Sequence, residues 1–303
     1  MENNFRANGK LLLTGEYAII FGATGLVLPL NRFQEMQVNK IKEPQPRLYW
    51  KAYDVNGLWF EAQWLLPDFS LHTTSNPDKA AYVLMLLQAI RNEKPAFLAD
   101  EFSYVVTHFC NFDIHWGLGS SSTLLVNLCR WAMTDPFRIY FKLFHGSAYD
   151  IAAAQINSPL IYNLSNNQPH IQSVSFNPPF LDQIMIIYSG RKQDTRKAIA
   201  HIKTFDENII NRISQLTLKF VSTTDIHQSM EIVREHEILI GQQIGEQPIQ
   251  EKYFSDFRGQ IKSLGAWGGD FWLAISEMSQ SEVTNYFDRK GYRTVFPLKT
   301  FMM

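Results

Sequence analysis

Cysteine is scarce in this sequence, because only Cys110 and Cys129 occur among 303 residues. The two form neither a Cys-x-x-Cys pair nor a spacing typical of metal ligands. This argues against a disulfide framework and against a cysteine-based metal site. We expect two buried thiols in a reducing compartment.

Neither sign of charge is in excess, because 28 Lys and Arg residues stand against 29 Asp and Glu residues, for a net charge of -1. This balance gives no reason to expect nucleic acid or an anionic membrane as the main partner. No apolar run approaches the roughly 20 residues needed to cross a bilayer. The polar segment 1–10 also lacks the apolar core of a signal peptide. We therefore expect a cytoplasmic protein.

The composition and patterning predict a packed α+β protein. Hydrophobic residues make up 46% of the chain and charged residues 19%, which favours a large core over disorder. The length corresponds to roughly two domains of about 150 residues. Apolar runs predict strands at 11–13, 35–40, 48–53, 102–109, 183–188, 273–275 and 292–297. Helical spacing predicts helices at 79–91, 121–133, 137–144, 149–155, 197–205, about 206–243 and 281–290. The Asn-, Ser- and Pro-rich stretch 163–179 is the best candidate for a domain junction.

A glycine-serine run lies between a predicted strand and a predicted helix: Gly117, Leu118, Gly119, Ser120, Ser121 and Ser122. Glycines let a backbone approach a ligand closely, and the amides and dipole of the following helix favour an anion. The run is not a Walker A loop, because no Gly-Lys-Ser/Thr follows. The alternative is an ordinary glycine turn with a serine N-cap.

This run resembles the second motif of the GHMP kinases, Pro-x-x-x-Gly-Leu-Gly-Ser-Ser-Ala. Residues 117–121 match in full, while Asp113 stands at the proline position and Ser122 at the alanine position. The family includes galactokinase, homoserine kinase, mevalonate kinase and phosphomevalonate kinase. The resemblance implies that the loop binds the ATP triphosphate, with Ser121 a candidate Mg²⁺ ligand.

The segment 9–18, Gly-Lys-Leu-Leu-Leu-Thr-Gly-Glu-Tyr-Ala, is similar to the first motif of the family, in the form closest to phosphomevalonate kinases. The ammonium of Lys10 is suited to stabilise charge on a transferred phosphoryl group. A lysine at a strand end is more commonly just solvated. By the resemblance, Lys10 is catalytic, and Glu16 and Tyr17 contact the substrate.

The segment 146–153, Gly-Ser-Ala-Tyr-Asp-Ile-Ala-Ala, resembles the family's Gly-Ser-Gly-x-Asp-x-Ala-Ala stretch, with Ala148 in place of the second glycine. The resemblance makes Asp150 the candidate general base. Asp150 can also act by positioning the acceptor, or simply as an N-cap. Mevalonate kinases carry a Mg²⁺-binding Glu on the preceding helix, whereas the segment 137–142 has no carboxylate. Mg²⁺ would then be held by ATP, water and Ser121.

The segment 262–271 resembles the third motif, Ser/Thr-Gly-Ala-Gly-Gly-Gly-Asp, although Leu264 replaces the Ser/Thr and Trp267 replaces a glycine. A tryptophan there would crowd a phosphate site unless its ring points away. The resemblance implies ATP binding by Gly265, Ala266 and Gly268 and substrate binding by Asp270.

A run with four basic residues at 191–197 precedes a predicted helix and suits an anionic acceptor. We expect Lys192 and Thr195 to contact the substrate, although a solvated helix start is equally consistent with the run.

The resemblance implies a two-domain α+β GHMP kinase fold. An N-terminal domain like ribosomal protein S5 domain 2 would span 1–165, and a ferredoxin-like domain would span 166–303. The implied activity is transfer of the γ-phosphoryl group of ATP, with Mg²⁺, to a small anionic acceptor, preferably mevalonate or phosphomevalonate. The alternatives are another acceptor, such as homoserine or a sugar, and a catalytically weak nucleotide-binding relative. We expect a monomer or homodimer without nucleic-acid or membrane partners.

Overall fold

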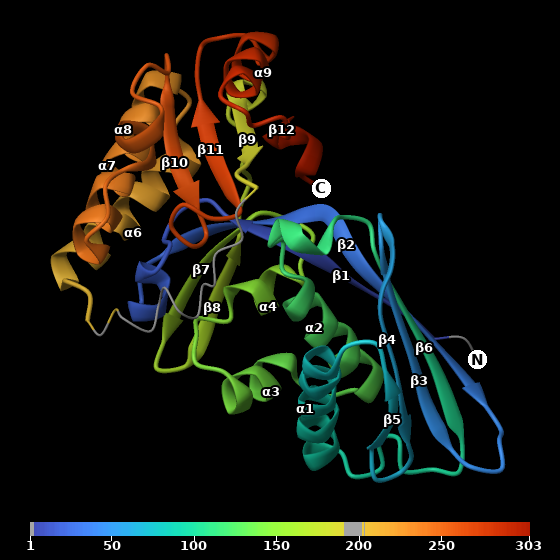
Figure 1. The fold of residues 1–303 in the computed structure, drawn as a ribbon. Coiled ribbons are helices and arrows are strands. Elements are labelled where there is room, and N and C mark those ends of the chain that lie inside the picture. The colour runs from blue at the N-terminus through green and yellow to red at the C-terminus, as the bar shows by residue number, and fades with distance from the viewer. Residues whose placement is uncertain (1–2, 191–201, 203) are drawn as a thin grey trace. The chain divides into compact units, whose positions relative to one another are not determined.

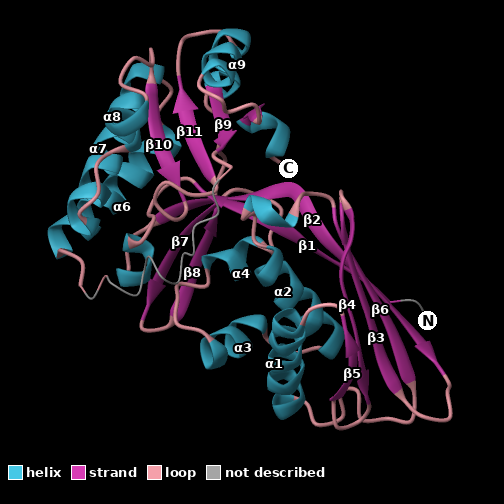
Figure 2. Cartoon of the chain, in the orientation of Figure 1, coloured by secondary structure: helices cyan, strands magenta, loops and turns pink. Residues whose placement is uncertain are grey.

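The computed structural model describes residues 3–190, 202 and 204–303. Its strands are β1 (Asn3–Leu12), β2 (Gly25–Ile41), β3 (Arg47–Asp54), β4 (Gly57–Leu65), β5 (Ser70–Thr74), β6 (Ser103–Cys110), β7 (Leu160–Ser165), β8 (Gln168–Ser173), β9 (Ile184–Tyr188), β10 (Gln260–Leu264), β11 (Phe271–Ile275) and β12 (Val295–Pro297). Its α-helices are α1 (Pro77–Glu93), α2 (Ser120–Ala132), α3 (Pro136–Leu143), α4 (Tyr149–Ala153), α6 (Glu207–Ser222), α7 (Ile226–Ile244), α8 (Ile249–Tyr253) and α9 (Gln280–Arg289). Short 3-10 helices are η1 (Ala18–Phe21), η2 (Ile114–Trp116), η3 (Leu181–Gln183) and η4 (Leu298–Phe301). Figure 2 shows this mixture of helix and strand.

The chain divides into two compact units, and neither unit is contiguous in sequence. Unit 1 comprises Met1–Gly9, Arg32–Ile114 and Leu118–Ile156. Unit 2 comprises Lys10–Asn31, His115–Gly117 and Asn157–Met303. The expected domain boundary between residues 165 and 166 is a single cut in the sequence, and it stays a prediction.

Unit 1 is a sheet covered on one face by helices. Its strands follow the order β5-β4-β3-β6-β2, with β3 and β6 parallel and the other neighbours antiparallel. Alternate residues of β3 are buried, including Leu48 and Trp50, because successive side chains in a strand point to opposite faces. Helices α1 and α2 lie on one side of these strands in Figure 1. Trp50 and Trp64 belong to the core that the strands share with these helices and meet edge to face, with ring centroids 6.1 Å apart. Burying such a side chain contributes about 1.5–3 kcal/mol or more.

Unit 2 contains a four-stranded antiparallel sheet in the order β10-β11-β9-β12. Helices α7 and α8 contact β10, and α6 packs against α7 (Figure 1). Residues 25–27 of β2 pair with β7, which forms a hairpin with β8. The core of this unit includes Phe254, Trp272 and Phe287, all buried.

Most elements expected from the sequence are confirmed within a few residues, including α1, α2, β3 and β9. The stretch 163–179, where a domain junction was expected, contains the hairpin of β7 and β8, and the junction itself stays a prediction. Asn166 and Asn167 both have positive φ (52° and 58°), which suits a tight hairpin turn. Strand β8 is mostly exposed, so it lacks the apolar alternation that marks a strand in sequence.

The single helical segment expected at about 206–243 is two helices, α6 and α7, broken where Asp225 begins the second as its N-cap. Strand β10 and helix α8 were not expected. The helix predicted at 197–205 falls mainly outside the described residues, and Phe205 itself is not helical.

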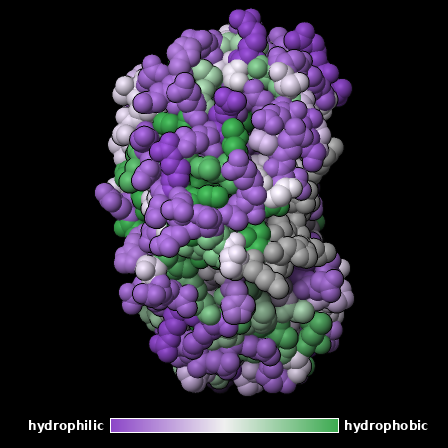
Figure 3. Space-filling model, turned by 90° about the vertical axis from the view of Figure 1, so that its left-hand side faces the viewer, coloured by the Kyte–Doolittle hydropathy of each residue, from purple (hydrophilic) through white to green (hydrophobic). Residues whose placement is uncertain are grey.

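Hydrophilic residues predominate on the face of the molecule in Figure 3, with hydrophobic residues in small areas between them. Among the described residues, no helix is both long and apolar enough to cross a membrane.

Candidate functional site

The predicted site residues fall in both compact units, so each unit is described by itself. In unit 1, Leu118 and Gly119 of the glycine-serine run lead into the N-terminus of α2. Gly119 is the N-cap in a left-handed conformation (φ 95°), and its carbonyl accepts from the amides of Ser122 and Thr123 at 3.1 and 3.0 Å. Side-chain capping is absent at this end, and the first turn holds no acidic residue. The positive end of the helix dipole therefore has no carboxylate of its own first turn to neutralise it, which suits an anion.

Helix α2 is fixed on the sheet by buried side-chain hydrogen bonds. Thr123 Oγ1 donates to Gln34 Oε1 at 2.8 Å, and Asn127 Nδ2 donates to the Gln34 carbonyl at 2.9 Å. Both bonds are shielded from water, so they hold the helix in one orientation on β2. Ser121, by contrast, is exposed, which leaves its side chain accessible to a ligand.

Two predicted residues of unit 1 meet directly. Ser122 Oγ donates a hydrogen bond to Asp150 Oδ2, and the Ile151 amide lies 3.1 Å from Asp150 Oδ1. Asp150 lies in the first turn of α4, after Ala148, which is left-handed with φ 57°. Glycine adopts that conformation freely, whereas alanine has it at a cost of about 1–2 kcal/mol. This explains why a glycine suits the position that Ala148 holds here.

Three predicted residues from three separate motifs meet in unit 2. Lys10 Nζ donates to the Gly117 carbonyl at 3.1 Å. Gly117 has φ 68°, and a Cβ added to it would collide with the carboxylate of Asp270. A glycine is therefore required at 117 both by the backbone conformation and by the close approach of Asp270.

The third-motif loop between β10 and β11 is held by hydrogen bonds to its backbone. Gly265 and Gly268 have positive φ (73° and 69°), and Ala266 is buried. The Gly268 amide donates to Ser263 Oγ at 2.8 Å, and the Trp267 amide donates to the Tyr17 hydroxyl at 2.6 Å. Leu264, at the position of the motif's Ser/Thr, is buried in β10.

The ring of Trp267 packs against the connection between α7 and α8. Trp267 Nε1 donates to the Gln247 carbonyl at 3.3 Å, and the ring lies close to Gly241 of α7. These contacts explain how a tryptophan is accommodated in the third-motif loop.

Glu16 and Tyr17 both lie in the interior of unit 2. Glu16 is 3% exposed and ion-paired with Lys262, and the hydroxyl of Tyr17 is occupied by the Trp267 amide. The role of both residues in substrate binding stays a prediction.

Sequence reasoning missed a buried polar cluster around Glu16. Lys262 Nζ donates to Glu16 and to the Ser263 carbonyl, the latter at 2.7 Å. His236 Nε2 accepts from the Gly15 amide at 2.8 Å, so the imidazole is neutral at that nitrogen.

Burial governs the protonation of this cluster. It lowers the pKa of His236 well below its usual value and raises the pKa of Glu16, although Lys262 partly offsets the rise for Glu16. Burial also raises the pKa of Glu237 to about 8, and its Oε1 accepts from the Ser263 amide at 3.1 Å. No local motif in the sequence marks these residues, because their partners are distant in the chain.

Two predicted substrate residues, Lys192 and Thr195, lie outside the described residues. For a metal, helix α3 carries no carboxylate, as expected from the sequence. Within residues 3–190, 202 and 204–303, no group of three or more His, Cys, Asp or Glu side chains is arranged to hold a metal ion. Ser121 as a Mg²⁺ ligand therefore stays a prediction.

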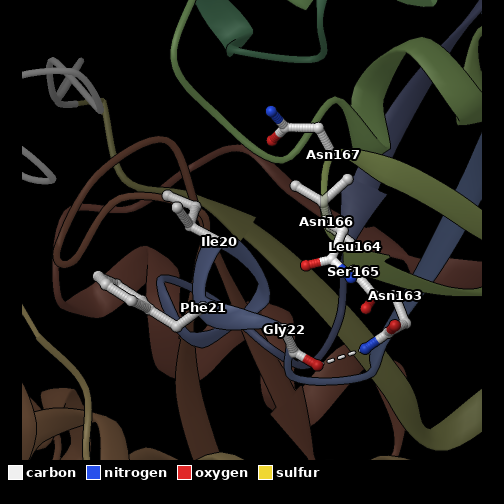
Figure 4. Close-up of a pocket in the computed structure, with 8 residues that line it drawn as sticks. All are labelled: Ile20, Phe21, Gly22, Asn163, Leu164, Ser165, Asn166 and Asn167. Carbon is white, nitrogen blue, oxygen red and sulfur yellow. Dashed lines mark hydrogen bonds between the residues drawn. The ribbon is translucent and has the colours of Figure 1, made fainter.

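A pocket of about 690 Å³ lies in unit 2 between η1 and the β7–β8 turn (Figure 4). Ile20, Phe21 and Gly22 form one wall, and residues 163–167 form the other. Asn163 Nδ2 donates to the Gly22 carbonyl across it. One of its two lining segments, residues 20–22, follows the first motif in sequence, but none of the predicted site residues lines the pocket.

Solved structures of several kinases share this fold, whereas no family model and no curated protein matches the sequence. The chain superposes on Streptococcus pneumoniae phosphomevalonate kinase in complex with phosphomevalonate and AMPPNP with a TM-score of 0.71, at 16% identity, over 97% of this chain and 99% of that one. For L. major mevalonate kinase in complex with R-mevalonate the TM-score is 0.69, at 12% identity, over 97% and 94%. For a D-glycero-D-manno-heptose 1-phosphate kinase of Bacteroides thetaiotaomicron it is 0.67, at 17% identity, over 100% and 96%.

Proposed function

We propose that this chain, which has the two-domain α+β fold of the GHMP kinases, is an ATP-dependent small-molecule kinase. The observation that carries the proposal is the meeting of Lys10, Gly117 and Asp270 in unit 2, because it unites three motifs that are far apart in sequence. The hydrogen bond between Ser122 and Asp150 in unit 1 supports it independently.

Each residue has a chemical role in this proposal. The glycine-serine loop and the amides at the start of α2 bind the triphosphate, with help from Gly265, Ala266 and Gly268. The ammonium of Lys10 stabilises charge on the transferred phosphoryl group. Asp150, oriented by Ser122, accepts the proton of an acceptor hydroxyl or positions the acceptor. Asp270 contacts the acceptor. Mg²⁺, held by ATP, water and Ser121, neutralises phosphate charge when bound.

Mevalonate or phosphomevalonate is the acceptor that we favour. The Gly-Glu-Tyr-Ala form of the first motif and Asp270 in the third support this choice. Among the similar structures, two are complexes with R-mevalonate and with phosphomevalonate, but another is a heptose 1-phosphate kinase. A phosphate acceptor needs little deprotonation, so Asp150 would then act mainly by positioning.

A second candidate is a nucleotide-binding protein with weak turnover. Leu264 at the Ser/Thr position of the third motif and the lack of a carboxylate on α3 favour it. This candidate predicts ATP binding with little or no ADP release.

The test is a coupled ADP-release assay with mevalonate, phosphomevalonate, homoserine and galactose. We expect Mg²⁺-dependent turnover with one of the first two. Asp150→Ala should then lower kcat by roughly 10²–10⁴-fold if Asp150 is the general base. The exposed Asp288 of α9 provides the control variant Asp288→Ala, which should keep full activity. Full activity of Asp150→Ala would refute its catalytic role, and binding of ATP without any turnover would favour the second candidate.

A further inference from the structure

The residue before Gly117 lies in an aromatic cluster of unit 2. The ring centroid of Trp116 is 5.5 Å from Phe296, 6.1 Å from Tyr188, 6.1 Å from Phe271 and 6.2 Å from Phe301. We call Trp116 and these four rings the aromatic anchor. Its members come from η2, β9, β11, β12 and η4, so four elements of unit 2 converge on the side chain that directly precedes the glycine-serine run.

The aromatic anchor is directly joined to the contact between Gly117 and Asp270. Trp116 precedes Gly117, and Phe271 follows Asp270. The rings of Trp116 and Phe271 meet edge to face at 89°, an arrangement that is attractive beyond the area it buries. The segment of Trp116 and Gly117 therefore contacts the segment of Asp270 and Phe271 twice: Trp116 packs on Phe271, and Gly117 lies against the Asp270 carboxylate. Rotation of one segment against the other would break both contacts.

Polar contacts hold the backbone of this segment as well. The Tyr188 hydroxyl lies 3.3 Å from the His115 carbonyl, and Lys10 Nζ donates to the Gly117 carbonyl. Phe271 and Phe301 are 1% and 0% exposed, whereas Trp116, Tyr188 and Phe296 are partly exposed, so the anchor lies at the edge of the core of unit 2. Because Trp116 contacts four rings, two of them fully buried, its ring has few alternative positions on that side.

We infer that Trp116, with Phe301 packed against it, is a positioning residue that fixes Gly117, the first residue of the glycine-serine run 117–122, for nucleotide binding. This inference rests on the proposed function in one respect, the identity of the ligand as ATP. The positioning itself is a property of the protein alone, and it is tested without any ligand.

The ligand-free test is hydrogen–deuterium exchange of the backbone amides of 117–122. Trp116→Ala should accelerate exchange there, Trp116→Phe should accelerate it less, and Phe301→Leu should have an effect between those of wild type and Trp116→Ala. Phe220 of α6 provides a matched control, because it is 0% exposed in the same unit and packs on Phe176 at 5.5 Å. Phe220→Leu should lower the urea midpoint without changing exchange at 117–122. Equal exchange at 117–122 in Trp116→Ala and wild type would overturn the inference.

The ligand-dependent test measures the Kd of ATP by calorimetry and the KM values of ATP and acceptor. We expect Trp116→Ala to raise the Kd and KM of ATP by roughly tenfold, with a smaller change in the acceptor KM. Trp116→Phe should restore most of the affinity, and Phe220→Leu should leave it unchanged. If Phe220→Leu raised the Kd and KM of ATP equally, the effect of Trp116→Ala would be explained by general destabilisation, and the inference would be overturned. A wild-type protein that does not bind ATP contradicts the proposed function instead, and the exchange result then decides the positioning role alone.

Discussion

The carboxylate of Asp270 fills the space that a side chain on Gly117 would need. Residues 153 positions apart (270 minus 117) are thus fitted to one another at the predicted active site. The glycine of the second motif and the aspartate of the third are structurally dependent, so either should tolerate substitution poorly.

Gly117→Ala tests this dependence. The variant meets both an unfavourable φ and a collision, so we expect a loss of about 2–4 kcal/mol in unfolding free energy and a large loss of ATP affinity. Gly245→Ala is the matched control, because Gly245 has φ 73° but no neighbouring atom within 4 Å of an added Cβ. It should lose only about 1–2 kcal/mol. Equal losses in the two variants, measured by urea denaturation, would show that the collision with Asp270 does not matter.

Ser121 and Ser122 should differ in their response to Mg²⁺. Ser121 is exposed and is the predicted ligand, so Ser121→Ala should raise the Mg²⁺ concentration for half-maximal turnover by roughly tenfold or more. Ser122 donates to Asp150, so Ser122→Ala should lower kcat by roughly tenfold at unchanged Mg²⁺ dependence. Titration of Mg²⁺ at saturating ATP measures both. If Ser121→Ala titrates like wild type, Ser121 does not hold the ion.

His108 should make unit 1 sensitive to acid. It is 1% exposed and packs against Trp50 with ring centroids 4.4 Å apart and the rings tilted by 33°. Neither ring nitrogen has a hydrogen-bond partner among the described residues. Burial lowers its pKa to about 3, whereas the unfolded chain titrates at 6.5. The unfolded state therefore binds one more proton, and the stability from this group is lost as the pH falls from 6.5 towards 3.

His108→Phe removes this titration while keeping a ring of similar size. Between pH 7.5 and pH 5 the variant should gain about 2 kcal/mol in unfolding free energy relative to wild type. Urea denaturation at the two pH values measures the difference. A parallel loss of stability in both proteins would show that other groups cause the acid sensitivity.

Lys262→Met should strongly destabilise unit 2. The change leaves Glu16 buried without its ammonium partner, which typically costs about 3–5 kcal/mol. The double variant Glu16→Gln, Lys262→Met removes both charges and should recover most of the loss. As a control, Lys40→Met breaks the half-exposed pair with Asp100 and should have a much smaller effect. Additive effects of the two buried substitutions would contradict the pairing.

The sequence was informative where a motif is local. The spacing of Gly117, Gly119 and the serines predicts a turn into a helix, because dihedral freedom and N-capping depend on neighbouring residues alone. Asp150 and Lys10 were found only because the resemblance supplies a motif around each. That Lys10, Gly117 and Asp270 meet could not follow from composition or periodicity, because the meeting depends on tertiary packing.

The features that were missed depend on distant partners or on weak local signals. Lys262 lies on a short strand whose sequence includes several polar residues, so its burial could not be predicted. The burial is explained by the ion pair with Glu16, which is distant in sequence. His236 lies in a helix without any sequence motif around it, and only the structure shows that it accepts a hydrogen bond from the Gly15 amide. The aromatic anchor could not be predicted either, because nothing in the sequence around Trp116 or Phe301 indicates that the two rings are in contact.

The interleaving of the two units has a consequence for synthesis on the ribosome. Residues 10–31 belong to unit 2, yet Glu16 pairs with Lys262, 246 positions later, and Trp116 packs on Phe301. The first segments of unit 2 therefore leave the ribosome long before their partners exist. Unit 1, whose last segment ends at Ile156, is free to fold at about the midpoint of translation, whereas unit 2 closes only when η4 emerges. Between those times residues 10–31 of the nascent chain lack their permanent contacts in unit 2, which is when the chain most needs protection from aggregation.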